Sequence, residues 1–216
     1  MMQRRCKVKI LIACEESQTI TKAFRKKGHE AYSCDLQEES GGHPELHIKG
    51  DALKEAYSGK YDLMIAHPPC TYLAVSGARW MYNKDGSRNK ERWNNQLEAL
   101  EFVQKLMNAP IDKIAVENPV SVISSQIRKP DQIIQPYHFG DEATKTTCLW
   151  LKGLPLLTHT NVVGKGEKVT YKSGKSHPKW YADALSKAKT KAERQKLRSK
   201  TFKGIANAIV DQWGSV

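Results

Sequence analysis

Between residues 7 and 151, short aliphatic segments alternate with longer segments of helical periodicity, and this alternation constrains the fold more than any other feature. Aliphatic and β-branched runs predict buried strands, whereas apolar residues that recur about every 3.6 positions predict helices. The expected strands span residues 7–14, 30–36, 47–51, 61–66, 113–116, 131–139 and 146–151. The expected helices in this part span residues 15–27 and 89–108, and a very basic helix is expected at residues 180–199. This pattern is typical of an α/β fold with an open, mostly parallel sheet and helices on both faces.

Polar residues collect at the positions where the predicted strands end. In open α/β sheets, ligands bind beyond the carboxyl ends of the strands. The residues with useful chemistry at these ends are Glu15, Glu16, Asp35, Asp51, His67, Cys70, Glu117 and Asn118. We therefore expect a functional site along this edge of the sheet.

Positive charge is concentrated in the last third of the chain. The whole sequence carries 35 Lys+Arg and 23 Asp+Glu, a net charge of +12. Residues 160–203 hold 13 of the basic residues and 3 of the acidic ones, a surplus of 10. Such a segment is typical of a surface that binds a polyanion, and a solvated basic face is the simpler alternative. We expect a core of residues 1–158, a basic insert of residues 159–200 and a helix in residues 201–216 that returns to the core.

Several classes of protein are disfavoured. No apolar run approaches the roughly 20 residues of a membrane span, and the basic start, residues 1–9, precedes too short an apolar segment for a secretory signal. We expect an intracellular protein without a membrane partner. The five cysteines, at positions 6, 14, 34, 70 and 148, include no CxxC pair, which disfavours disulfides and zinc. His43 and His47 have a metal-compatible spacing, but Gly42 and Pro44 disfavour a helix there, so no metal is expected.

Cys70 and Glu117 are the two candidate catalytic residues. Cys70 follows a predicted central strand and a Pro68-Pro69 turn, so it is a candidate nucleophile if a nearby cation or helix start lowers its pKa. Glu117 ends the next predicted strand between apolar neighbours, which can raise the pKa of a carboxyl and let it donate a proton. The simpler alternatives are a packing cysteine and a carboxylate that supports the start of a following helix.

Three motifs, in this order, resemble those of the DNA (cytosine-5) methyltransferases. Pro-Pro-Cys at residues 68–70 is similar to the catalytic Pro-Cys motif, and Glu117-Asn118 is similar to Glu-Asn-Val. The segment 204–209, Gly-Ile-Ala-Asn-Ala-Ile, resembles the closing Gly-Asn-Ala-Val motif, which returns the chain to the cofactor-binding half. The resemblance implies a Rossmann-like class I methyltransferase fold with a short basic C-terminal module. It also implies a compact, phage-type member without a full target-recognition domain.

The resemblance implies a mechanism that uses S-adenosylmethionine as cofactor. Cys70 would attack C6 of a cytosine, Glu117 would hold N3 and the amino edge, and C5 would then take the methyl group. The cytosine must leave the duplex for this, because C6 is inaccessible inside it. The basic and aromatic loop at residues 71–92, with Arg79 and Trp80, is suited to close over the flipped base.

The predicted cofactor site departs from the family pattern. The family's aromatic-x-Gly-x-Gly turn is replaced by residues without glycine, and we expect Glu15, Glu16 or Ser17 to contact the methionine part instead. By resemblance, Asp35 would bind the ribose and Asp51 the adenine amino group, although acidic residues at strand ends are also common turn formers. Pro68 and Asn207 complete the cofactor residues that the resemblance implies.

The predicted DNA contacts also depart from the pattern. The family's Gln-x-Arg-x-Arg strand is replaced by residues 143–150, where Lys145 is the only cation and Thr147 follows two positions later. Asn118, Lys145 and Thr147 are expected to contact the target nucleotide. The basic insert replaces a larger recognition domain, with the phosphate contacts Lys187, Lys191, Arg194 and Arg198. Lysine-rich surfaces bind phosphates and read bases poorly, so we expect weak sequence specificity for double-stranded DNA, as in a virus-encoded or accessory enzyme.

Two alternatives remain open from the sequence. Amino methyltransferases use an Asp/Asn/Ser-Pro-Pro-aromatic motif that residues 67–70, His-Pro-Pro-Cys, half match, but this interpretation leaves Glu117 unused. The other alternative is a non-catalytic nucleic-acid-binding protein built on a methyltransferase scaffold. The missing glycines and the arginine-poor strand favour it.

Overall fold

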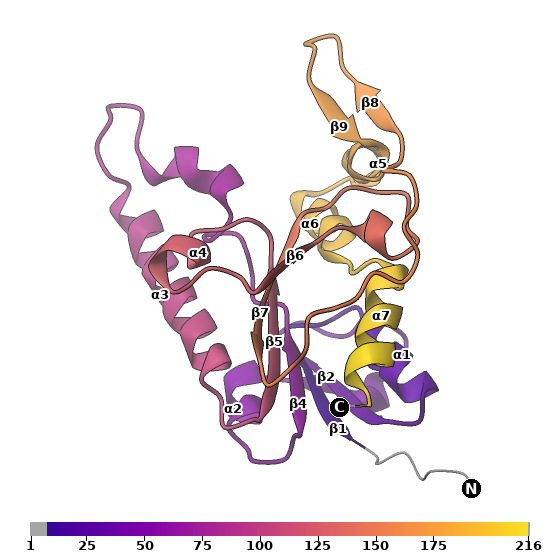
Figure 1. Ribbon diagram of the computed structural model, residues 1–216. Coiled ribbons are helices and arrows are strands. Elements are labelled where there is room, and N and C mark those ends of the chain that lie inside the picture. The colour runs from indigo at the N-terminus through magenta and orange to yellow at the C-terminus, as the bar shows by residue number, and fades with distance from the viewer. Residues whose placement is uncertain (1–7, 216) are drawn as a thin grey trace, which may run out of the picture.

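A computed structural model describes residues 8–215 of the chain (Figure 1). Residues 1–7, which hold most of the basic start and Cys6, lie outside the described residues. A seven-stranded sheet has the order β3-β2-β1-β4-β5-β7-β6, and a separate hairpin pairs β8 with β9. The strands are β1 (Lys9–Ala13), β2 (Glu30–Asp35), β3 (His47–Lys49), β4 (Leu63–Ala66), β5 (Lys113–Asn118), β6 (Gln132–Ile134), β7 (Thr147–Lys152), β8 (Lys168–Thr170) and β9 (Ser176–Pro178).

The sheet is parallel except for one strand. From β3 to β5 every neighbouring pair is parallel, so these five strands present their carboxyl ends at the same edge. Strand β7 runs antiparallel to both β5 and β6. The predicted fold class, a mostly parallel α/β sheet, is confirmed.

Helices cover both faces of the sheet (Figure 1). Within residues 8–215, no helix is long and apolar enough to cross a membrane. The α-helices are α1 (Thr19–Lys26), α2 (Ala52–Ala56), α3 (Lys90–Met107), α4 (Ile123–Gln126), α5 (Lys179–Lys187), α6 (Lys191–Ser199) and α7 (Lys203–Trp213). The 3₁₀ segments are η1 (Pro44–Leu46), η2 (Val75–Met81) and η3 (Pro136–His138).

Side chains of the central strands alternate between two buried cores, because successive residues of a strand point to opposite faces. In β1, Ile10 and Ile12 join the core beneath α1 and α7, whereas Leu11 joins the core on the side of α2 and α3. Both faces of the central strands are therefore buried. This explains why these strands appear in the sequence as continuous apolar runs.

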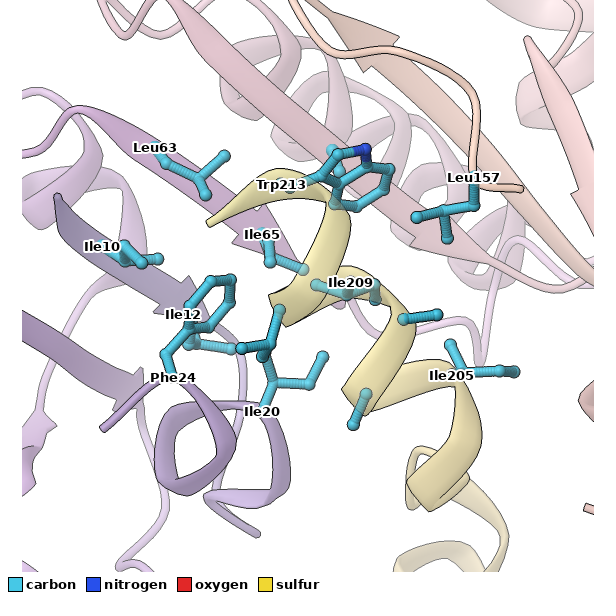
Figure 2. Close-up of a cluster of buried hydrophobic side chains, with 14 of the residues drawn as sticks. Ile10, Ile12, Ile20, Phe24, Leu63, Ile65, Leu157, Ile205, Ile209 and Trp213 are labelled. Carbon is cyan, nitrogen blue, oxygen red and sulfur yellow. The ribbon is translucent and has the colours of Figure 1, made fainter. Parts of the chain in front are cut away.

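Helix α7 packs on the first core. Ile209 and Trp213 of α7 belong to the same buried cluster as Ile20 and Phe24 of α1, and the Trp213 ring lies beside Leu157 (Figure 2). At the start of α7, the backbone N–H of Gly204 donates to the Asp141 carboxylate (2.8 Å). A Cβ atom at Gly204 would overlap the carbonyl oxygen of Phe139, so only glycine allows this approach.

Three expected elements differ in length or number. Helix α1 begins at Thr19 rather than at residue 15, because a tight turn follows β1. The strand expected at residues 131–139 ends at Ile134, since Pro136 starts η3. The basic segment expected as one helix at residues 180–199 is two helices, because Thr190 and Glu193 form a capping box that starts α6.

Candidate active site

The Pro-Pro turn directs Cys70 out of the sheet at the carboxyl end of β4. The His67 N–H still donates to the Ala13 carbonyl (2.9 Å), which keeps the turn attached to β1. The buried side-chain amide of Asn118, at the end of β5, donates to the Pro68 carbonyl (2.8 Å). Beyond the prolines, Cys70 is exposed. The two strands that flank β4, β1 and β5, thus hold the turn in place and present the thiol at the sheet edge.

Glu117 forms a close pair with His67. Nδ1 of His67 lies 2.7 Å from Oε2 of Glu117, and the two side chains are 14% and 19% exposed. Burial opposes ionisation of Glu117, but the hydrogen bond and charge of His67, with the charge of Lys145, lower its pKa below the ordinary value. The expectation of a raised pKa is therefore wrong. The sequence shows the apolar neighbours of Glu117, but the contact with His67, 50 positions away, forms only in the fold.

Cys70 is a thiol in the resting protein. Although Cys70 is exposed at the surface, the surrounding protein removes part of the water around its thiol. This desolvation, and then the charge of Glu117, raise the pKa of Cys70, while Lys145 and Arg198 act in the opposite direction. The cations that were expected to activate the cysteine are present, but they do not outweigh burial and the carboxylate. A base must therefore remove the thiol proton before Cys70 can act as a nucleophile.

Lys145 connects the sheet edge to the basic insert. Its ammonium donates to the carbonyls of Ser199 (3.5 Å) and Lys200 (3.2 Å) at the end of α6. Thr147, the first residue of β7, is buried and donates its hydroxyl to the Lys145 carbonyl (3.2 Å). Lys145 thus lies close enough to Glu117 and Cys70 to influence their charge, whereas Thr147 supports the Lys145 backbone.

The turn after β1 adopts a glycine-like conformation without glycine. Cys14 and Gln18 have φ angles of 59° and 55°, in the left-handed region that non-glycine residues rarely occupy. Gln18 fixes this turn by hydrogen bonds to the His43 N–H and carbonyl. The absence of glycine from the sequence therefore does not prevent the tight turn.

The three residues expected to contact the methionine part of the cofactor are used within this turn. Both carboxylate oxygens of buried Glu15 accept hydrogen bonds from the start of α1, at Ile20 and Thr21. Glu16 accepts from the Ser40 hydroxyl and lies 3.6 Å from the Lys196 ammonium of α6. The Ser17 hydroxyl lies 3.1 Å from that of Thr19. Glu15 thus stabilises the fold.

Asp35 and Asp51 flank the same turn. The pKa of the Cys14 thiol is raised, first by burial and then by the charges of Asp35, Cys34 and Asp51. Both carboxylates therefore lie near Cys14. Oδ1 of Asp35 accepts from the Gln37 N–H (2.9 Å), and Oδ1 of Asp51 caps α2. In each case Oδ2 has no hydrogen-bond partner within residues 8–215.

A basic cavity lies between two arms that project from the same side of the sheet. One arm contains η2 and the start of α3, and the other contains α5, α6 and the β8–β9 hairpin (Figure 1). The cavity has a volume of about 750 Å³. Its lining residues are Arg79, Trp80, Asn89, Glu91, Arg92, Asn95, Lys191, Arg194 and Arg198. Five cations and one carboxylate therefore face the same space.

Two details connect this cavity to Cys70 and to aromatic stacking. Trp80 is 55% exposed, and the Cζ atom of the Arg79 guanidinium lies over it, 4.4 Å from the centre of the Trp80 ring. Arg198 acts on Cys70 electrostatically and stacks on Tyr181 at 4.6 Å. Cys70 does not itself line the cavity, but Arg92, which does, donates to the carbonyl of the next residue, Thr71 (3.0 Å).

Two other expected site residues lie outside this cavity. Lys187 lines a separate cavity of about 410 Å³ between α5 and α6, with Lys189, Lys196 and Lys200. Asn207 is exposed on α7, whose flanking residues Ala206 and Ala208 face the core.

Sequence analysis gave Leu36 no role in this site and did not pair His67 with Glu117. Leu36 is 76% exposed directly after Asp35, and the signal is a large aliphatic side chain at a strand end. His67 was expected at the strand end, but the sequence gives no signal for its contact with Glu117. Arg92, which belongs to the loop expected to close over the base, lines the cavity from the first turn of α3.

His47 makes two polar contacts within the fold. Its ring nitrogens lie 2.8 Å from the Ser33 hydroxyl and 3.0 Å from the Gln37 carbonyl. Residues 8–215 contain no group of three His, Cys, Asp or Glu side chains arranged to hold a metal ion.

No known family profile and no curated protein matches the sequence. Among solved structures, a candidate DNA modification methyltransferase encoded within an Escherichia coli prophage is 12% identical, with a TM-score of 0.46, covering 73% of this chain and 52% of that one. A Spodoptera frugiperda DNMT2 mutant is 12% identical, with a TM-score of 0.41, covering 74% and 55%. The chain thus spans about half the length of the solved structures it matches. The sheet order, with one antiparallel strand inserted beside β5, gives the chain a Rossmann-like methyltransferase fold.

Proposed function

We propose that the chain is an S-adenosylmethionine-dependent DNA methyltransferase that modifies C5 of cytosine through Cys70. The observation that carries the proposal is the placement of Cys70 and Glu117 at adjacent strand ends, beside a cavity lined by five cations. A thiol next to a carboxylate suits covalent addition to an electron-poor ring, and the cations suit the phosphates around it.

The residues near Cys14 fit the proposed cofactor. Asp35 and Asp51 each keep one carboxylate oxygen for a ligand, which suits the ribose hydroxyls and the adenine amino group. Leu36, exposed beside Asp35, offers an apolar surface for the flat adenine ring. Pro68 is buried near the cofactor edge, where it shapes the turn. When bound there, S-adenosylmethionine supplies an electrophilic methyl group.

The chain's own residues then carry the reaction at the base. Cys70 adds to C6, which forms an S–C6 bond and moves electron density toward C5 and N3. Glu117 accepts from the cytosine amino group and pairs with N3 as that nitrogen gains a proton. After C5 has taken the methyl group, loss of its proton and departure of Cys70 restore the ring.

The basic cavity explains how a flipped base could be held. Arg79, Lys191 and Arg194 offer cations to the backbone, and exposed Trp80 offers a ring for stacking. Lys145 acts electrostatically on both Cys70 and Glu117, which supports its proposed contact with the target nucleotide. Lysine and arginine contacts to phosphates carry no sequence information directly, so the proposal retains weak sequence specificity on double-stranded DNA.

Two contacts disfavour the amino methyltransferase alternative. The Pro68 carbonyl already accepts from Asn118, and His67 is already paired with Glu117. Both groups are thus engaged where an amino methyltransferase would bind the exocyclic amino group. The C5 mechanism uses Cys70 and Glu117 together and leaves both of these contacts intact.

Nucleoside mass spectrometry tests the proposal. The protein is incubated with unmodified duplex DNA and methyl-labelled S-adenosylmethionine, and the label is expected in 5-methylcytosine. Label in N4-methylcytosine or N6-methyladenine would instead support the amino alternative. Cofactor binding without any labelled base would show that DNA is not the substrate, and loss of both would support a non-catalytic nucleic-acid-binding protein.

A further inference from the structure

The hydrogen bond between His67 and Glu117 has a defined donor and acceptor. Nε2 of His67 is buried and has no hydrogen-bond partner within residues 8–215. A proton on Nε2 would therefore be buried without an acceptor, which is costly. Of the two neutral tautomers of His67, the one with its proton on Nδ1 is therefore favoured, and this N–H donates a hydrogen bond to Glu117, 2.7 Å away.

With His67 as the donor, Glu117 is the acceptor. Its Oε2 is held by His67, and Oε1 has no hydrogen-bond partner within residues 8–215. Cys70 lies within electrostatic range, because the charge of Glu117 raises the pKa of the thiol. The other groups that act on this carboxylate or thiol are Lys145, Arg198 and buried Cys148.

We propose that His67 is a positioning residue that holds Glu117 as an anion, so that the carboxylate takes the Cys70 proton and passes it to N3 of the cytosine. The inference rests on the proposed C5 methylation. The S–H bond breaks, the S–C6 bond forms from the thiolate electron pair, and N3 receives the same proton through Glu117. The addition step therefore needs no external acid or base.

The environment of Glu117 predicts the effect of removing His67. Burial alone raises the pKa of this carboxyl, and His67 is the first of the groups that reverse the shift. Activity requires ionised Glu117, so activity is lost as the pH falls through the pKa of this carboxyl. Without His67, burial prevails, this pKa rises, and the acid limb of the rate profile moves to higher pH.

Two substitutions separate this role from packing. His67→Leu removes the hydrogen-bond donor, whereas His67→Asn keeps an N–H donor in the place of Nδ1 but cannot titrate. His43→Leu is the matched control, because it removes a histidine from an exposed pair with Glu45 (3.1 Å). The rate of 5-methylcytosine formation is measured from pH 4 to 9, with KM for DNA determined separately.

The His67→Leu variant is expected to have its acid limb at least one pH unit higher and to lose kcat at the acid end of the range, with KM little changed. The His67→Asn and His43→Leu variants should keep the acid limb of the unmodified protein. If His67→Leu lowers kcat without moving the limb, or if His67→Asn is as impaired as His67→Leu, the inference is overturned while the proposed function stands. An unmodified protein that makes no 5-methylcytosine would overturn the proposed function, and the inference with it.

Discussion

Neutralising the inner face of α6 should weaken the salt dependence of DNA binding by an amount that the cavity predicts. Lys191, Arg194 and Arg198 line the cavity from this helix, and Arg79 and Arg92 face them from the other arm. Each phosphate contact contributes about −0.9 to the slope of log K against log salt, so five contacts give a slope of about −4.5. Replacing the three α6 cations by glutamine should reduce the slope to about −1.8.

This change is large enough to measure. Between 50 and 200 mM salt, a slope of about −4.5 lowers affinity roughly 500-fold, and a slope of about −1.8 lowers it roughly 12-fold. Fluorescence anisotropy of a labelled duplex across this salt range gives both slopes. The control carries glutamine at Lys26, Lys60 and Lys105, which lie near the opposite edge of the sheet where helices lead back to strand starts. Equal slopes for the inner-face variant and the unmodified protein would refute this account of the cavity.

Three further predictions follow from individual contacts. Glu15→Ala should lower the free energy of unfolding by about 1–3 kcal/mol, because three donors at the start of α1 lose their acceptor, and urea denaturation measures this. Gly204→Ala should lower it by about 1–3 kcal/mol through overlap with the Phe139 carbonyl, whereas Gly50→Ala, which has open space, should change it little by the same measurement. Leu36→Ser should weaken S-adenosylmethionine binding by about fivefold in calorimetry, the equivalent of about 1 kcal/mol of lost apolar contact, while Leu97→Ser on α3 leaves it unchanged.

The order of strands along the chain was predictable from the sequence because each buried strand is a continuous aliphatic run. Ile10–Ile12 and Leu63–Ile65 are buried on both faces, so their sequences lack the alternation of a half-exposed strand. The placement of Cys70 and Glu117 at one edge follows from the parallel arrangement of β4 and β5. These features depend on local pattern and on a general rule of α/β sheets.

The properties that depend on tertiary contacts were not predictable in the same way. The direction of the Glu117 pKa shift depends on His67, and the sequence does not show that these two side chains meet. The cavity depends on where α6 lies relative to the loop that carries Trp80. The break before α6 was visible in principle, because Thr190 and Glu193 have the spacing of a capping box.

The most direct test of the central claim is to trap the bond between Cys70 and the target base. Duplex DNA containing 5-fluorocytosine is incubated with the protein and S-adenosylmethionine, and tryptic peptides are analysed by mass spectrometry. Fluorine at C5 leaves no proton to remove after methyl transfer, so the S–C6 bond should persist. The account predicts a methylated 5-fluorocytosine adduct on the peptide that contains Cys70, absent in Cys70→Ala and retained in Cys148→Ala. An adduct on another cysteine, or methyl transfer to unmodified cytosine without any adduct, would contradict it.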